Sequence, residues 1–186
     1  MSAFDTSKTY EFIYSGEKFR ADDETHTIRG TAVVFGEVTR DYRSITFAPG
    51  SITADNDVAL QVMHGGLAFA RMSRDTLQLN IDKKRVRYTA QLNPEDPEAM
   101  SLFAKVKRGD VTDSSMGVKI ENYTIDEATE VVTVNKATLQ EISIVGTGAF
   151  KGADVSLSAL STDMSALKRR KALAELKLRT LTATKE

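Results

Sequence analysis

Alternating apolar and polar positions along the chain predict a mainly β protein. Residues 85–92 show the pattern well, because Val86, Tyr88 and Ala90 alternate with polar side chains, as in a strand with one buried face. The polar residues 82–84 just before them are typical of a hairpin turn. We expect strands over residues 10–19, 25–35, 43–48, 57–63, 76–81, 85–92, 116–125, 130–136 and 138–145.

A helical period interrupts these strands between residues 93 and 109. Residues 93–97 contain two prolines and two acidic side chains, which are favoured in the first turn of a helix. Gly109 follows three basic residues and ends the helix. The apolar side chains at helical spacing form one face, made of Ala99, Leu102, Phe103 and Val106.

The end of the chain differs in composition from the rest. Residues 153–163 are small and polar, and residues 164–181 return to a helical pattern. We therefore place a boundary near residue 160, between a domain over residues 1–160 and a basic helical tail over residues 161–186. From Asp163 onward the chain has seven basic and three acidic residues, a net charge of +4. Two interpretations stay open: the tail docks on an acidic partner, or its charges keep an exposed helix solvated.

Composition excludes several function classes. The 186 residues are enough for about one domain with a buried core. The absence of cysteine excludes disulfides, a thiol nucleophile and thiolate metal sites. The sequence has neither a signal-like N-terminus nor an apolar run of about 20 residues, so we expect a soluble intracellular protein without a membrane partner.

Metal, nucleotide and nucleic-acid binding are also disfavoured. The two histidines lie 38 positions apart, and the glycine pairs lack the lysine and the spacing of a phosphate loop. The basic tail contains no aromatic residue on which bases could stack. We expect no metal, no cofactor and no nucleic-acid partner.

Three positions carry the residue types of a serine hydrolase. His64 closes an apolar run and opens onto two glycines, where an imidazole suits a general base. Ser114 and Ser115 form a hydroxyl pair close to Gly117, and Glu141 is a lone acid within the apolar segment 138–145. A base, a nucleophile and an orienting acid together would activate a serine for attack on a carbonyl.

The residues alone leave alternatives open. His64 also fits a strand-end histidine that binds a backbone carbonyl, and His26 fits a solvated turn. Strict alternation puts Leu139, Glu141 and Ser143 on one face and Ile142 and Ile144 on the other, so the acid points either to a site or to solvent. Ser114 and Ser115 face opposite sides of a strand, so only one can meet His64.

Six segments in order resemble the prohead maturation proteases of tailed bacteriophages, which are distant relatives of the herpesvirus assemblins. The resemblance spans about residues 28–157. The segments are 30–35 (GTAVVF), 47–52 (FAPGSI), the run ending at His64, 106–109 (VKRG), 115–118 (SMGV) and 139–145 (LQEISIV).

This resemblance implies an α+β, mainly β fold: an assemblin-like closed β-barrel core with peripheral helices, here followed by the C-terminal helical tail. It implies a serine endopeptidase with His64, Ser115 and Glu141 as catalytic residues. The register of the serine motif selects Ser115 over Ser114. A histidine as third member would follow the serine in the chain, which favours Glu141 over His26.

The resemblance also implies a biological role. Such an enzyme acts inside the immature capsid, the prohead, in the cytoplasm of the bacterial host. It cleaves the scaffolding segment of the major capsid protein and also itself, so its partners are the capsid protein, its scaffolding segment and further copies of the enzyme. The tail over residues 161–186 would dock on capsid or scaffold. The alternatives are a catalytically inactive capsid assembly or scaffolding factor and a plain β-barrel binding module.

Overall fold

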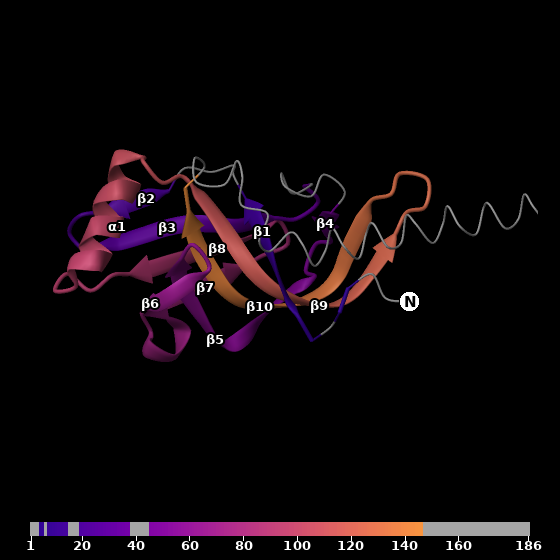
Figure 1. Ribbon diagram of the computed structural model, residues 1–186, viewed down its shortest axis with the longest axis horizontal. Coiled ribbons are helices and arrows are strands. Elements are labelled where there is room, and N and C mark those ends of the chain that lie inside the picture. The colour runs from indigo at the N-terminus through magenta and orange to yellow at the C-terminus, as the bar shows by residue number, and fades with distance from the viewer. Residues whose placement is uncertain (1–3, 6, 15–18, 38–44, 147–186) are drawn as a thin grey trace, which may run out of the picture. The chain divides into compact units, whose positions relative to one another are not determined.

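The computed structural model describes residues 4–5, 7–14, 19–37 and 45–146 (Figure 1). The strands and the helix within these residues belong to one unit, residues 6–152. The predicted boundary near residue 160 and the predicted tail lie outside the described residues. The elements are β1 (Thr9–Tyr14), β2 (Arg20–Asp22), β3 (Thr27–Val34), β4 (Ile45–Phe47), β5 (Ile52–Val62), β6 (Gly65–Arg71), a 3-10 turn η1 (Met72–Arg74), β7 (Leu77–Ile81), β8 (Arg85–Gln91), α1 (Pro97–Arg108), β9 (Asp113–Ile125) and β10 (Val132–Val145).

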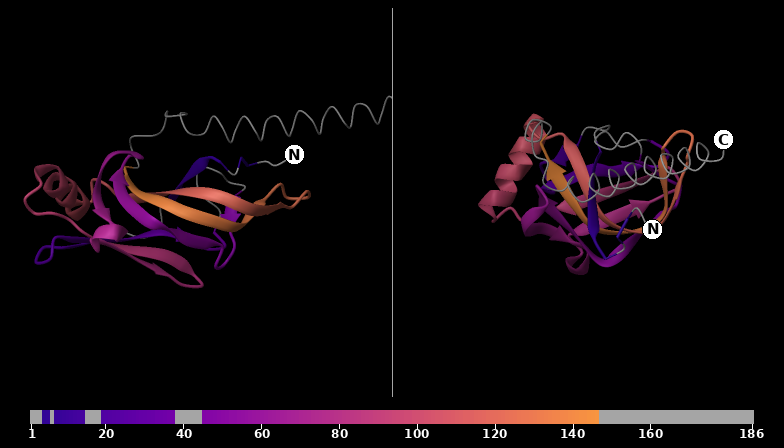
Figure 2. Two further views of the ribbon diagram at one scale, coloured as in Figure 1. Left: turned by 90° about the horizontal axis from the view of Figure 1, so that it is seen from below. Right: turned by 45° about the vertical axis from the view of Figure 1, so that its right-hand side comes forward.

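The described strands form two separate sheets (Figures 1 and 2). The larger has six strands in the order β1-β9-β10-β5-β6, with β4 also paired to β10, and the smaller has four in the order β2-β3-β8-β7. Strand β10 runs parallel to β4 and β5, and the other pairs are antiparallel. The α+β, mainly β class is confirmed. The closed barrel is not confirmed: within the described residues, the two sheets are not closed into a barrel by strand pairing.

A buried tyrosine links the two sheets. The Tyr88 hydroxyl, from β8 of the smaller sheet, lies 2.8 Å from Ser114 Oγ of β9 in the larger one. Gly30 of β3 makes room for the ring, because a Cβ atom there would lie 2.5 Å from the hydroxyl oxygen. Burial raises the pKa of Tyr88, so the phenol stays protonated and available for this hydrogen bond. Ser114 therefore faces the interior between the sheets.

Helix α1 begins and ends where the sequence predicts. The Asp96 side chain accepts a hydrogen bond from the Glu98 backbone N–H at 2.9 Å, and Pro97 follows it as the first helical residue. Gly109 closes the helix with a φ of 83°, a value that glycine adopts readily. The predicted apolar face is confirmed, since the buried residues are Ala99, Leu102, Phe103 and Val106. Within the described residues, no helix is long and apolar enough to cross a bilayer.

The strand predictions differ from the structure at three places. Strands β2 and β6 were not expected. The segments 130–136 and 138–145 form a single strand, β10, because the Ala137 backbone N–H donates to the carbonyl of Ser51 at 2.7 Å and pairing continues on both sides. As a result the strand of Ser115 and the strand of Glu141 are direct neighbours.

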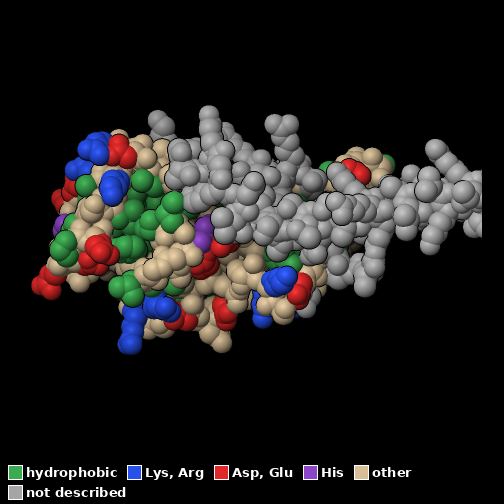
Figure 3. Space-filling view, viewed as in Figure 1, with side chains coloured by type: hydrophobic (Ala, Val, Ile, Leu, Met, Phe, Trp, Pro, Cys, Tyr) green, Lys and Arg blue, Asp and Glu red, His purple; other side chains and the backbone are tan. Residues whose placement is uncertain are grey.

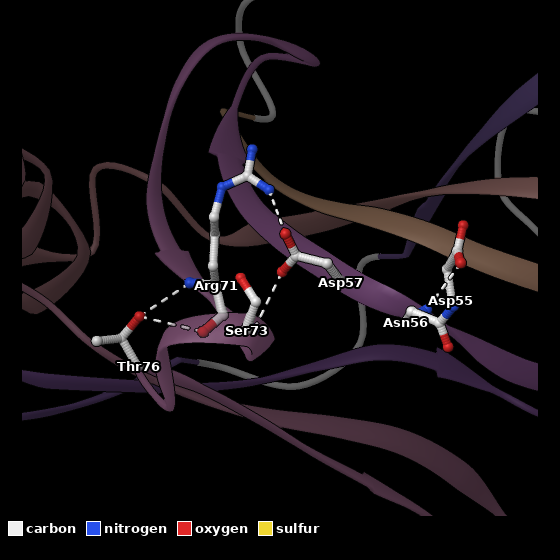
Figure 4. A network of polar contacts seen from close by, with 6 residues as sticks. All are labelled: Asp55, Asn56, Asp57, Arg71, Ser73 and Thr76. Carbon is white, nitrogen blue, oxygen red and sulfur yellow. Dashed lines mark hydrogen bonds and ion pairs between the residues drawn. The ribbon is translucent and has the colours of Figure 1, made fainter.

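A polar network ties the β5–β6 hairpin together at the end opposite its turn (Figure 4). Asp57 of β5 accepts hydrogen bonds from Arg71 Nη1 at 2.6 Å and from the Ser73 backbone N–H at 3.1 Å. Thr76 Oγ1 in turn accepts from the Arg71 backbone N–H at 2.9 Å. The hydrogen bond from the Ser73 N–H contributes most to the lowered pKa of Asp57, because it stabilises the charged carboxylate. The network holds the hairpin that presents His64.

Replacing Tyr88 by phenylalanine tests the link between the sheets. It leaves the buried Ser114 hydroxyl without a partner, so we expect a loss of about 1–3 kcal/mol in the free energy of unfolding, measured by denaturant titration. Because removing both partners is nearly neutral, the double variant Tyr88→Phe/Ser114→Ala should be more stable than the sum of the single variants implies. Additive losses would contradict the hydrogen bond.

Candidate active site

His64 lies in a two-residue turn with an unusual backbone. The turn joins β5 to β6, and its residues Met63 and His64 have φ values of 58° and 55°. Two positive φ angles in succession match the twist of a tight hairpin, where asparagine and glycine are the usual residues. A methionine and a histidine there cost about 1–3 kcal/mol each. Such strain is found most often at functional sites.

Strand β10 holds this turn at three points. The Met63 backbone N–H donates to the carbonyl of Ile144 at 3.3 Å, and the His64 backbone N–H donates to Ser143 Oγ at 3.1 Å. His64 Nδ1 lies 2.6 Å from Glu141 Oε1. A carboxylate accepts this bond from a protonated Nδ1, which leaves Nε2 as the nitrogen that can take a proton. Both side chains are largely buried, with 12% of His64 and 16% of Glu141 exposed.

A β-bulge turns Glu141 toward His64. Leu139 pairs with Val118 of β9 and Glu141 pairs with Gly117, so Gln140 is an extra residue in β10. The bulge reverses the alternation: Leu139 is buried in the core, and Glu141 lies on the opposite face. The expectation that these two residues share a face was wrong, because strict alternation assumes an unbroken strand.

Gly117 gives the Glu141 side chain its room. A Cβ atom on Gly117 would lie 2.5 Å from Glu141 Cγ and 3.0 Å from its Oε1, closer than such atoms pack. The Glu141 side chain therefore approaches the backbone of β9 closely at this position. Gly117 also pairs with Glu11 of β1 on its other side, so two glutamates flank one glycine.

Ser115 lies on the same face of the sheet as Glu141. It pairs directly with Ser143, the residue that accepts the His64 backbone N–H, and paired side chains in neighbouring strands point to one face. Ser114 points the other way, toward Tyr88. Ser115 is fully buried, and its Oγ has no hydrogen-bond partner among the described residues, so the structure does not join Ser115 to His64 by a hydrogen bond. The catalytic roles of His64, Ser115 and Glu141 stay predictions.

His26 takes no part in this arrangement. It lies in the turn between β2 and β3, and its ring packs against Phe103 of α1 with 5.8 Å between ring centres.

Sequence reasoning missed three polar residues near the site. Glu11 Oε1 lies 3.7 Å from His64 Nδ1, and no local pattern links residues so far apart in the chain. Ser143 alternates with Glu141, and this spacing could have identified it. Asp113 is buried two residues before Ser115, on the same face of β9, and one of its carboxylate oxygens has no hydrogen-bond partner.

Glu11, His64 and Glu141 also have the donor atoms of a metal site. One nitrogen and two carboxylate oxygens lie within 4.8 Å of one another. A divalent cation bound there would compete with the hydrogen bond from His64 Nδ1 to Glu141, because a metal needs the unprotonated nitrogen. The group therefore suits a histidine held between two carboxylates at least as well as a metal.

Comparison with known families agrees with this chemistry. The family model described as caudovirus prohead serine protease matches residues 15–169. The chain belongs to this family. The resemblance seen in the sequence is thereby confirmed, and the matched range includes the His64 turn, β9 and β10. Neither the curated proteins nor the solved structures include a match to the chain.

A methyl group at position 117 tests how this member of the prohead serine protease family holds Glu141. In Gly117→Ala the new methyl displaces the Glu141 side chain, so we expect a loss of about 1–3 kcal/mol in the free energy of unfolding. A crystal structure should show a longer distance from His64 Nδ1 to Glu141 Oε1. Gly146→Ala is the matched control, because a Cβ atom there meets nothing within 4 Å. Equal stability of the two variants would contradict the close contact.

Proposed function

We propose that the chain is a serine endopeptidase of capsid maturation, with His64 as general base, Ser115 as nucleophile and Glu141 as the residue that orients the base. The observation that carries the proposal is the 2.6 Å contact between His64 Nδ1 and Glu141 Oε1 on the face of the sheet that also bears Ser115. Membership of a serine protease family supports the same assignment.

Each residue has a defined step in this proposal. His64 Nε2 takes the proton of Ser115 Oγ as the oxygen attacks the carbonyl carbon of the substrate peptide bond. Glu141 stabilises the positive imidazolium, which then gives its proton to the leaving amine. A water molecule, deprotonated by His64 in the same way, hydrolyses the acyl-enzyme and frees Ser115.

The substrate in this proposal is the scaffolding segment of the major capsid protein, together with the enzyme itself. Cleavage takes place inside the prohead in the host cytoplasm, and the basic tail over residues 161–186 docks the enzyme on capsid or scaffold. Because hydrolysis removes the segment that supports assembly, it makes assembly irreversible.

A second function, a non-catalytic capsid assembly factor, is favoured by one observation. The Ser115 side chain is fully buried and its hydroxyl makes no hydrogen bond, whereas a serine protease needs this oxygen near both the imidazole and the substrate. Apo enzymes often have longer catalytic hydrogen bonds than their substrate complexes, so we prefer the peptidase.

Co-expression with the major capsid protein of the same phage tests the nucleophile. Ser115→Ala should abolish capsid-protein processing, measured by mass spectrometry of the particles, because the attacking oxygen is lost. Ser114→Ala is the matched control: it removes a neighbouring hydroxyl on the other face of β9 and should retain processing. Normal processing by Ser115→Ala would reject the assignment, and particles without processing by any variant would favour the assembly factor.

A double-mutant cycle tests whether Glu11 assists Glu141. Glu141→Gln should lower kcat by roughly 10²–10⁴-fold, because the amide no longer stabilises the imidazolium. Glu11→Gln should lower it by no more than about tenfold in the wild-type background, since its carboxylate is farther from Nδ1. In the Glu141→Gln background the Glu11→Gln change should cost more, because Glu11 is then the remaining carboxylate. Identical effects in both backgrounds would show that Glu11 does not assist.

A further inference from the structure

An apolar pocket of about 390 Å³ lies at the end of the larger sheet, beside helix α1. Its apolar walls come from the β5–β6 hairpin, from α1, from the segment before β9 and from the end of β10. The residues that matter here are Val62, Met63, Phe69, Leu102, Val111 and Ile144. Figure 3 shows hydrophobic side chains gathered beside α1, with a histidine side chain at the border of the group.

The segments that build this pocket also build the candidate active site. Met63 precedes His64 in the strained turn, and Ile144 follows Ser143, which binds the His64 backbone N–H. The Met63 N–H bond to the Ile144 carbonyl joins the two walls directly. A peptide with its scissile bond at the His64 turn would therefore have this pocket within reach of a neighbouring residue.

The chemistry of the pocket selects an apolar side chain. Glu98 and Lys105 of α1 are exposed and lie at its rim, where their opposite charges leave no net preference for a charged group. Met63 is 41% exposed and Leu67 of the same hairpin is 82% exposed, so the hairpin offers apolar surface to a partner. Covering such surface favours a complex, because apolar area is removed from water.

The size of the pocket limits its occupant. A volume of about 390 Å³ lies near the lower end of the range of ligand pockets, which suits one or two amino-acid side chains better than a cofactor. Methionine at the wall adapts to occupants of different shape.

We infer that this pocket binds a large aliphatic or aromatic side chain of the substrate polypeptide, close to the scissile bond. The inference rests on the proposed peptidase function and adds the class of substrate residue that the enzyme selects.

Cleavage profiling of the full-length protein tests the inference. The protein is incubated with a peptide library, and mass spectrometry identifies the residues enriched near the cut. The wild type should enrich leucine, methionine or phenylalanine at one position. Ser101→Trp fills the pocket from an exposed position of α1 and should lower kcat/KM for these peptides by about tenfold or more, while peptides with alanine there are cut as before. Phe69→Ala enlarges the pocket and should shift the preference toward larger side chains.

The control is Ala104→Trp, an equally exposed position of α1 that does not line the pocket. It should retain the wild-type profile. Cleavage without enrichment of apolar residues near the cut, or the same cleavage profile for all variants, would overturn the pocket assignment. Neither result would contradict the proposed peptidase function. The same holds if Ser101→Trp prevents incorporation into proheads without changing the profile, because the pocket would then bind a capsid partner. A wild type that cuts neither peptides nor capsid protein would overturn the proposed function itself.

Discussion

The candidate site depends on the missing side chain at Gly117. Strands β9 and β10 are paired through this residue, and any Cβ there would overlap the Glu141 side chain. With glycine in place, the Glu141 side chain lies over Gly117, and its carboxylate contacts the imidazole of His64. Gly117 also pairs with Glu11 of β1, so a second carboxylate lies 3.7 Å from the same His64 Nδ1. The absence of a Cβ atom at position 117 thus lets Glu11, His64 and Glu141 gather on one face of the larger sheet.

Two further local features make this contact possible, and both depart from regular β structure. The bulge at Gln140 puts Glu141 on the face opposite Leu139, so the strand buries its leucine without burying its acid. The turn at Met63 and His64 presents its backbone N–H groups to β10, where the Ile144 carbonyl and the Ser143 hydroxyl accept them. The larger sheet supplies a rigid support for both, and the buried hydrogen bond between Tyr88 and Ser114 holds the second sheet against it.

The features that could be predicted from the sequence are those set by residues close together in the chain. The ends and the buried face of helix α1 were predicted because the signals from residues 93–97 and from Gly109 act within a few residues of their own positions. The face of Glu141 was not predictable, because the bulge results from pairing with strands β5 and β9 rather than from the sequence around Gln140. The position of Glu11 near His64 was not predictable for the same reason, since only the order of strands in the sheet brings β1 beside β9. The choice between a barrel and two sheets likewise depends on pairing between distant strands, which periodicity does not report.

The left-handed backbone at position 64 has a consequence for how this chain balances folding against its proposed chemistry. Glycine or asparagine would adopt that φ more readily than histidine does. The residue that the proposed chemistry needs is therefore not the residue that the turn prefers. A substitution of His64 that stabilises the hairpin would remove the proposed base. Selection for thermal stability alone would favour glycine or asparagine at position 64.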